Sequence, residues 1–234
     1  MLDYDKTQPL IFIHIPKTAG TSVRSIFEQW FGGELFFHYY IEALNEMPIR
    51  HNIFEKNHDQ QAAVVYGHFN RRRNFGVEDY YPNAKQFITL LRDPLETRIS
   101  TYFYLQKVAH GWSKYPEPHD PDLQNYLRNN KSVMLNFFPR KVTFENYKEI
   151  IEKYFIEIGV VENIELSMEN IATKLQKPYN NGMLERLNVT ERDQSVTEEL
   201  RNIFIESNEL EYTVYNYVKS NYFDINGKIS KKCL

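Results

Sequence analysis

The sequence predicts an α/β fold in which a central parallel sheet is covered by helices on both faces. Short continuous apolar runs recur along the chain, and most of them lead into a turn and then a helical pattern. Strands that are buried on both faces of a parallel sheet have this uninterrupted apolar character. The chain of 234 residues is long enough to bury one sizeable core. It contains no repeat, low-complexity tract or linker, so we expect a single domain over residues 1–234.

Four strands and several helices are expected from the apolar pattern. The expected strands are 10–15, 62–66, 87–91 and 156–161. The expected helices are 22–30, 94 to about 108, and 163–175. Asp93 is the expected N-cap of the second of these helices, with Pro94 in its first turn.

The C-terminal half is predicted to hold two loops and a long final helix. Segment 111–121 is rich in proline and segment 177–192 is polar and contains N-N-G, so both are expected to be loops. Ser195 and Glu198 form a capping-box pair, which predicts one helix running from there toward Asn221.

Charge, cysteine content and hydropathy exclude several classes of protein. The chain has 28 Lys and Arg against 31 Asp and Glu, a formal net charge of -3, so a bulk nucleic-acid binder is not expected. A single cysteine, Cys233, permits neither an intrachain disulfide nor a cysteine-rich zinc site. No apolar run approaches the roughly 20 residues of a membrane span. The N-terminus is acidic where a signal peptide is basic, so we expect a cytoplasmic protein.

The segment P-K-T-A-G-T-S at residues 16–22 follows the first expected strand and opens the first expected helix. Such a turn directs backbone N–H groups and the positive end of the helix dipole at one point, which suits a phosphate. Gly20 permits close approach of a ligand, and Lys17 adds a mobile cation. Hydroxyl donors are supplied by Thr18, Thr21 and Ser22. The order differs from a Walker A loop because Lys17 precedes Gly20, and an ordinary strand-to-helix turn with a surface lysine is the alternative.

The end of the third expected strand carries a second candidate anion site. Arg92 follows this strand directly, and Ser100 lies two helical turns further on. Ligands of open parallel sheets bind at the carboxyl ends of the strands, so Arg92 and Lys17 can face one crevice. A guanidinium and a hydroxyl suit a second phosphate. The alternative for Arg92 is a salt bridge with Asp93 or Glu96.

His68, in Y-G-H-F, lies just beyond the second expected strand at the same edge of the sheet. An imidazole there can act as general base for a hydroxyl nucleophile, although a lone loop histidine often has no catalytic role. Arg71, Arg72 and Arg73 follow. The arginine run is interpreted either as a solvated turn or as a clamp for an anionic acceptor or a cofactor phosphate.

These motifs, in this order, resemble those of sulfotransferases that use 3′-phosphoadenosine 5′-phosphosulfate (PAPS). The branch with the greatest resemblance is the carbohydrate branch, which includes the heparan sulfate and uronosyl 2-O-sulfotransferases. I-F-I-H-I-P-K-T-A-G-T-S resembles the 5′-phosphosulfate loop and I-T-L-L-R-D-P-L-E-T-R-I-S-T-Y-F the 3′-phosphate motif. Y-G-H-F is similar to the segment that holds the catalytic histidine. The resemblance covers residues 10–110 best and implies a three-layer P-loop-like fold.

The resemblance also implies a role for each motif. Lys17 would contact the 5′-phosphosulfate and stabilise the charge that develops on the bridging oxygen. Arg92 and Ser100 would bind the 3′-phosphate, and His68 would take the proton of the acceptor hydroxyl. The 5′-phosphate would be held by Thr18, Gly20, Thr21 and Ser22. Sulfuryl transfer can proceed by positioning and cationic stabilisation, so no metal is expected to be required.

The expected acceptor is a hydroxyl group on a saccharide. The 2-O-sulfotransferases have a second histidine two positions before the catalytic one, where this chain has Tyr66. The Arg71–Arg73 run and Trp112 are candidate acceptor contacts, since basic and aromatic groups suit sugars and acids. Two alternative functions are a P-loop-like ATP-dependent kinase and a non-catalytic module that binds a nucleotide or a glycan.

Overall fold

The strands of the chain form one parallel sheet in the computed structural model, which describes residues 1–56, 62–109, 122–184 and 194–220. Within these residues the sheet has five strands in the order β2-β3-β1-β4-β5, and each neighbouring pair is parallel. The strands are β1 (Leu10–Ile13), β2 (Leu35–His38), β3 (Val64–Gly67), β4 (Gln86–Leu91) and β5 (Phe155–Val160). The chain leaves β1 toward β2 and β3 on one side and later adds β4 and β5 on the other, so the strand order reverses at β1.

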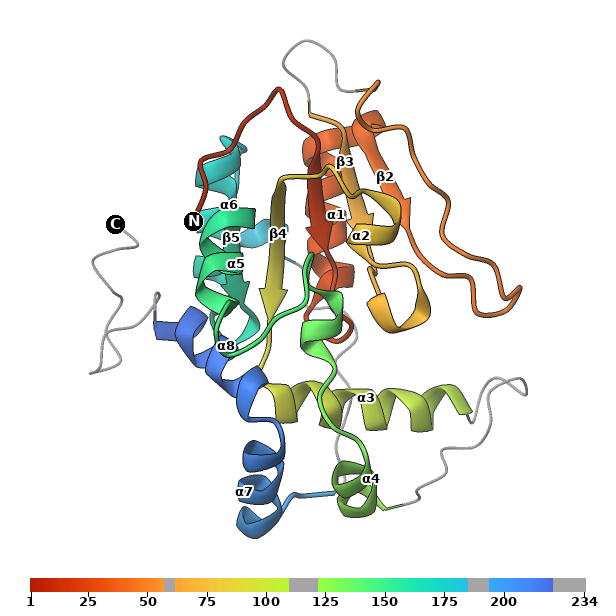
Figure 1. Cartoon of the computed structure of the whole chain (residues 1–234), viewed down its shortest axis with the longest axis vertical. Helices are drawn as coiled ribbons and strands as arrows, with labels where there is room; N and C mark the ends of the chain where they lie inside the picture. Colours follow the sequence, from red (N-terminus) through yellow and green to blue (C-terminus); the bar gives the residue numbers. More distant parts are fainter. Residues whose placement is uncertain (57–61, 110–121, 185–193, 221–234) are drawn as a thin grey trace.

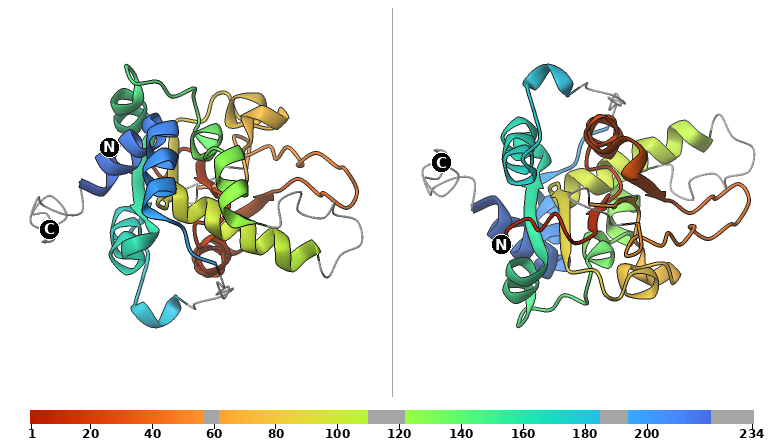
Figure 2. Two further views of the ribbon diagram at one scale, coloured as in Figure 1. Left: turned by 90° about the horizontal axis from the view of Figure 1, so that it is seen from below. Right: turned by 90° about the horizontal axis from the view of Figure 1, so that it is seen from above.

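Helices cover both faces of the sheet (Figures 1 and 2). The helices are α1 (Gly20–Phe31), α2 (Val77–Tyr80), α3 (Pro94–Ala109), α4 (Leu123–Asn129), α5 (Tyr147–Tyr154), α6 (Ile164–Leu175), α7 (Glu198–Ser207) and α8 (Glu209–Ser220). Helices α1 and α6 pack on one face, against Leu10 and Phe12 of β1. Helices α2, α5 and α8 pack on the other, against Ile11 and Ile13. The alternation of β1 side chains between the two cores confirms the predicted three-layer α/β architecture.

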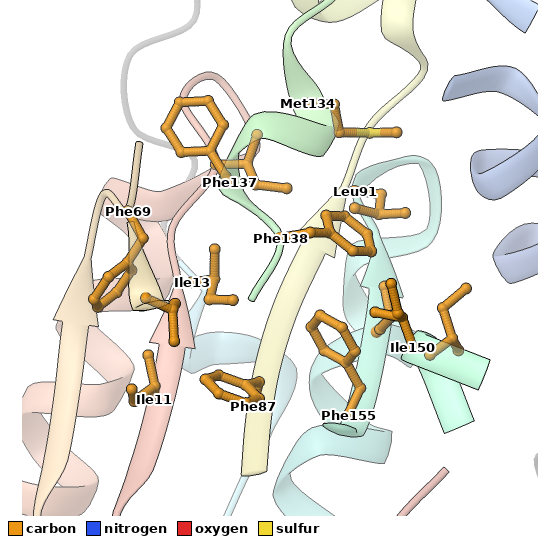
Figure 3. Packing of buried hydrophobic residues seen from close by; sticks show 14 of the residues in the cluster. Ile11, Ile13, Phe69, Phe87, Leu91, Met134, Phe137, Phe138, Ile150 and Phe155 are labelled. Carbon is orange, nitrogen blue, oxygen red and sulfur yellow. The ribbon is translucent and has the colours of Figure 1, made fainter. Parts of the chain in front are cut away.

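The second of these cores reaches the carboxyl edge of the sheet. The short 3₁₀ helix η3 (Met134–Phe137) lies over the strand ends, and Figure 3 shows Phe137 above Ile13. Beyond this edge, α3 lies across the ends of the strands in Figure 1. A third cluster joins α3 to α4 and α7 through buried side chains such as Ile99, Leu127 and Phe204. The carboxyl edge is therefore bordered by well-packed elements.

Each of the four predicted strands is present, and two predictions about helices need correction. The expected single helix toward Asn221 is interrupted at buried Asn208, whose side-chain oxygen accepts a hydrogen bond from Ser132 N at 2.8 Å. The N-cap of α7 is Thr197 rather than Ser195, because the Thr197 side chain accepts from Leu200 N. Asp93 is confirmed as a cap, since its Oδ1 accepts from Glu96 N at 3.0 Å.

Strand β2 was not predicted, because it is a short edge strand whose apolar run ends in His38. Within the predicted loop 177–192, the described part contains the short 3₁₀ helix η5 (Asn181–Met183). The predicted loop 111–121 lies outside the described residues. Among the helices that the structure describes, none combines the length and the apolar character that a membrane crossing requires.

Candidate active site

Four strands deliver a polar side chain to the same edge of the sheet. His14, Tyr39, His68 and Arg92 are each the first residue after β1, β2, β3 and β4. The ends of the first three strands are flush, because Gly67 pairs with both Ile13 and His38. Two backbone hydrogen bonds extend this register, from His14 N to Gly67 O (2.8 Å) and from His68 N to His38 O (2.9 Å). Parallel register thus brings together residues that are far apart in the sequence.

The turn between β1 and α1 has the backbone of an anion-binding loop. Lys17 (φ 69°) and Ala19 (φ 60°) are both left-handed, a conformation that is costly for residues with a side chain. The Thr18 hydroxyl donates to Ile15 O at 2.8 Å, so it stabilises the turn from within. Helix α1 starts after Ala19, which has no side-chain group that can cap it. The free N–H groups at the N-terminus of such a helix suit an anionic ligand. A turn in which left-handed residues alternate with other conformations, as at Lys17 and Ala19, directs further N–H groups to the same point.

Gly20 is required by the packing of His14. A Cβ atom at Gly20 would lie only 1.8 Å from His14 Nε2, so any other residue would displace the imidazole. The Gly20 carbonyl accepts a hydrogen bond from the Tyr66 hydroxyl at 2.7 Å. That Gly20 permits close approach of a ligand stays a prediction. The structure shows that the absence of a side chain at Gly20 makes room for the His14 imidazole.

Lys17 lies among other cations. Arg92 Nη1 donates to the Lys17 carbonyl at 3.2 Å, which joins the end of β4 to the turn after β1. Lys17 Nζ is 4.1 Å from the centroid of the Tyr104 ring on α3. Burial lowers the pKa of Lys17, and the charges of Arg92 and Lys107 lower it further. An anion that binds beside such a lysine stabilises its charged form and raises its pKa again.

Arg92 also has an acidic neighbour. Its Nη2 is 3.9 Å from Glu96 Oε2, so the salt bridge weighed as an alternative is present together with the Lys17 contact. Ser100 is partly buried on α3, and it shares a helical face with Tyr104 and Lys107. The face of α3 that carries Ser100 therefore also carries Tyr104 and Lys107, which lie near Lys17.

The imidazole of His68 is held in one tautomer. Its Nδ1 is 2.6 Å from the His14 carbonyl oxygen, which can only accept, so Nδ1 carries the proton and Nε2 a lone pair. Burial lowers the pKa of His68, and the hydrogen bond to the His14 carbonyl opposes this effect. A neutral imidazole with an unprotonated Nε2 is the form that a general base requires.

Two residues that the sequence reasoning did not assign complete this cluster. The His14 ring lies 4.3 Å from the His68 ring between centroids, and His14 Nδ1 is 3.0 Å from the Tyr39 hydroxyl. The Tyr39 ring meets the His68 ring edge-on at 4.9 Å. Burial, followed by the charges of His68, Arg24 and Lys17, holds the pKa of His14 well below its usual range. The sequence feature that could have identified His14 is its position directly after a strand, which is also the position of His68.

The arginine run lies in a short 3₁₀ helix, η2 (Arg71–Arg73). Arg71 donates to Phe138 O at 3.1 Å, and its Nε is 3.3 Å from Glu78 Oε2. Arg73 pairs with Glu42 and lies 4.0 Å above the Tyr40 ring, whereas Arg72 is exposed. The outer two guanidinium groups thus already have acidic partners.

Two further sequence predictions concern the surroundings of the site. Trp112, the aromatic candidate for acceptor contact, lies outside the described residues. Within the four described ranges, no group of three or more His, Cys, Asp or Glu side chains is placed to hold a metal ion.

The fold and this edge define an α/β protein with a strand-to-helix turn, suited to an anionic ligand, at the switch point of a parallel sheet. A model of the sulfotransferase family matches residues 1–157, from the N-terminus into β5, and the chain therefore belongs to the sulfotransferase family. Membership identifies it as an enzyme that transfers sulfuryl groups. No curated protein sequence matches the chain at a significant level.

Two solved structures illustrate how far the similarity extends. A mouse sulfotransferase, SULT7A1, complexed with PAP is 11% identical over 99% of this chain and 73% of its own, with a TM-score of 0.47. A sulfotransferase from Alicyclobacillus acidocaldarius is 13% identical over 89% of this chain and 96% of its own, with a TM-score of 0.44.

Proposed function

We propose that this protein transfers the sulfuryl group of PAPS to a hydroxyl group and that His68 is the general base. The observation that carries the proposal is the pairing of two features at one sheet edge. One is a neutral imidazole with an unprotonated Nε2, fixed by the His14 carbonyl at 2.6 Å. The other is the cationic turn that contains Lys17 and adjoins Arg92.

The residues of the turn and of α3 fit the anionic ends of PAPS. The N-terminus of α1 and Lys17 would hold the 5′-phosphosulfate. The residues that would assist at the 5′-phosphate are Thr18, Gly20, Thr21 and Ser22. Arg92 and Ser100 would hold the 3′-phosphate. When bound, PAPS supplies an activated sulfuryl group. Lys17 would then stabilise negative charge on the departing side. Burial lowers its pKa, the neighbouring cations lower it further, and an anion beside it would offset both effects.

His68 would act on the opposite, accepting side. Its Nε2 takes the proton of the attacking hydroxyl, and the imidazolium that forms keeps its Nδ1–H bonded to the His14 carbonyl. The same hydrogen bond orients the ring throughout, since a backbone carbonyl does not change protonation state. Burial lowers the pKa of His68 below 6.5, so the imidazole is ready to accept a proton at neutral pH.

The saccharide acceptor and the cytoplasmic location rest on the sequence. The motif resemblance to the carbohydrate branch supports a saccharide, and the roles of Arg71, Arg72, Arg73 and Trp112 in binding it stay predictions. A transfer assay with labelled PAPS over a panel of glycans and simple alcohols tests the acceptor. Preference for simple alcohols over every glycan would contradict the saccharide assignment.

Replacing His68 by Ala tests the mechanism. We expect sulfuryl transfer to fall by about 10²–10⁴-fold, the usual contribution of a positioned base. By calorimetry, 3′-phosphoadenosine 5′-phosphate (PAP), the product that PAPS would leave after transfer, should bind as in the wild type. In the wild type, kcat/KM should fall as the pH drops through the lowered pKa of His68, because protonation removes the base. His51→Ala, which removes an imidazole beside Phe36 instead, is the matched control. Near-normal transfer by His68→Ala would exclude His68 as the base.

Calorimetry also separates the proposed donor from the kinase alternative. PAP should bind more tightly than ATP with magnesium, because the Arg92 and Ser100 side would engage a 3′-phosphate that ATP lacks. Tighter binding of ATP with magnesium would contradict PAPS as the donor.

A further inference from the structure

The imidazole of His14 fills the space between the proposed base and the proposed donor site. One side of its ring faces the His68 ring, with centroids 4.3 Å apart. Its Nε2 edge lies over Gly20, where a Cβ atom would come within 1.8 Å. Its Nδ1 is held by the Tyr39 hydroxyl at 3.0 Å. His14 therefore contacts the proposed base, the first residue of α1 and the first residue after β2 at the same time.

Both ring nitrogens of His14 lie against groups of the protein. Nδ1 is engaged by Tyr39, and Nε2 lies against the backbone of Gly20. His68 has the complementary arrangement, since only its Nδ1 is engaged. The two adjacent imidazoles, whose planes are 35° apart, thus differ at Nε2, the atom that a general base uses.

We propose that His14 is a positioning residue, which sets the separation between His68 and the anion-binding turn at residues 16–22. The proposal rests on the proposed function of His68 and adds to it a second histidine that does not exchange a proton. The backbone of His14 contributes as well, because its carbonyl fixes the His68 tautomer.

The arrangement matters because in-line transfer tolerates little displacement. A shift of about 1 Å in a reacting group costs on the order of 10²-fold in rate. Without the His14 ring, His68 would lose a ring with which it is in contact and would be free to move toward Gly20. Burial keeps His14 neutral, so it does not add a charge beside Lys17 or beside His68 once that ring is protonated.

Three variants separate positioning from simple packing. In His14→Ala we expect transfer to fall about 10²-fold, while PAP affinity stays within about threefold of the wild type. In Gly20→Ala the new methyl group displaces the imidazole, so transfer, PAP affinity and the melting temperature should all fall. In the double variant the methyl group enters the space that the ring has left. The double variant should therefore regain PAP affinity and melting temperature relative to Gly20→Ala but not regain transfer.

The outcomes of these variants decide the inference. Recovery of transfer in the double variant would show that His14 only fills space, and wild-type transfer by His14→Ala would equally overturn the inference. Tyr39→Phe, which removes the hydroxyl that holds Nδ1 but keeps the ring, should lower transfer about tenfold with unchanged PAP affinity. Unchanged transfer in Tyr39→Phe would contradict the part assigned to this hydrogen bond.

Nitrogen NMR of the His68 imidazole provides a readout that does not depend on turnover. The wild type should show protonated Nδ1, and His14→Ala should show a mixture of tautomers and a pKa closer to 6.5, because the ring is no longer held in its buried position. An unchanged His68 signal would contradict the inference. If His68→Ala retains transfer, the proposed function fails, whatever the NMR spectrum of the His14 variant shows.

Discussion

The turn that contains Lys17 and the short helix η2 at Arg71–Arg73 are both rich in positive charge, yet their charges are used in opposite ways. Arg73 pairs with Glu42, which raises its pKa, and Arg71 lies against Glu78. Lys17 instead has cations nearby, and its pKa is lowered by burial and by Arg92 and Lys107. A raised pKa indicates that the cation is already paired with an acidic group. A lowered pKa indicates that the charged form is destabilised, so binding an anion would stabilise it.

The contrast also separates a structural role from a proposed functional one. The contacts of Arg73 with Glu42 and with the Tyr40 ring tie the segment after β2 to the segment after β3. The contact of Arg92 with the Lys17 carbonyl ties β4 to the turn after β1. Both pairs stabilise the fold, but only the second leaves positive charge beside a helix N-terminus. In this chain the arginine run is therefore the weaker candidate for an anion site, and the turn that contains Lys17 is the stronger one.

Lys17→Ala should produce the largest effect on function. We expect transfer to fall by about 10²–10³-fold, as for the loss of one stabilising group at a developing charge, and PAP to bind more weakly. A transfer assay and calorimetry measure the two effects, and Lys85→Ala on the surface before β4 is the control. If Lys17→Ala and Lys85→Ala behave alike, the turn is not the donor site.

Arg92→Ala should have the next largest effect. PAP should bind about 10–100-fold more weakly, because a hydrogen bond to a charged group contributes about 1.5–3 kcal/mol. Arg92→Lys keeps the charge but not the planar guanidinium, so its affinity should lie between those of Arg92→Ala and the wild type. Calorimetry with PAP and with adenosine 5′-phosphate, which lacks the 3′-phosphate, shows whether the lost affinity depends on that phosphate. An equal loss for both ligands would contradict the assignment of Arg92 to the 3′-phosphate.

Arg73→Ala should have the smallest effect. Its ion pair with Glu42 is exposed and contributes about 0.2–1 kcal/mol to the free energy of unfolding, with a similar amount from the Tyr40 ring. The melting temperature should fall by a few degrees, as measured by calorimetry, while PAP affinity and kcat stay unchanged. A large rise in the KM of the acceptor would show that Arg73 binds the acceptor, and the contrast with Lys17 would no longer hold.

Most of the fold followed from local pattern. Apolar runs located β1, β3, β4 and β5, and the helices after β1, β4 and β5 followed from their periodicity. Strand β2 escaped because an edge strand is stabilised on one side only. The break at Asn208 escaped because its cause, the hydrogen bond to Ser132, joins residues 76 positions apart. Local patterns therefore predict the elements well and their long-range contacts poorly.

The candidate site divides in the same way. The sequence alone identified Lys17, His68 and Arg92, because each follows an apolar run that had to be a strand, and parallel strands share one carboxyl edge. Only the tertiary structure determined that His14 stands between His68 and Gly20, and that Arg73 is paired with Glu42. The physical reason is that strand positions depend on local hydrophobicity. Which side chains touch depends instead on sheet order and register, which are set by pairings between distant segments.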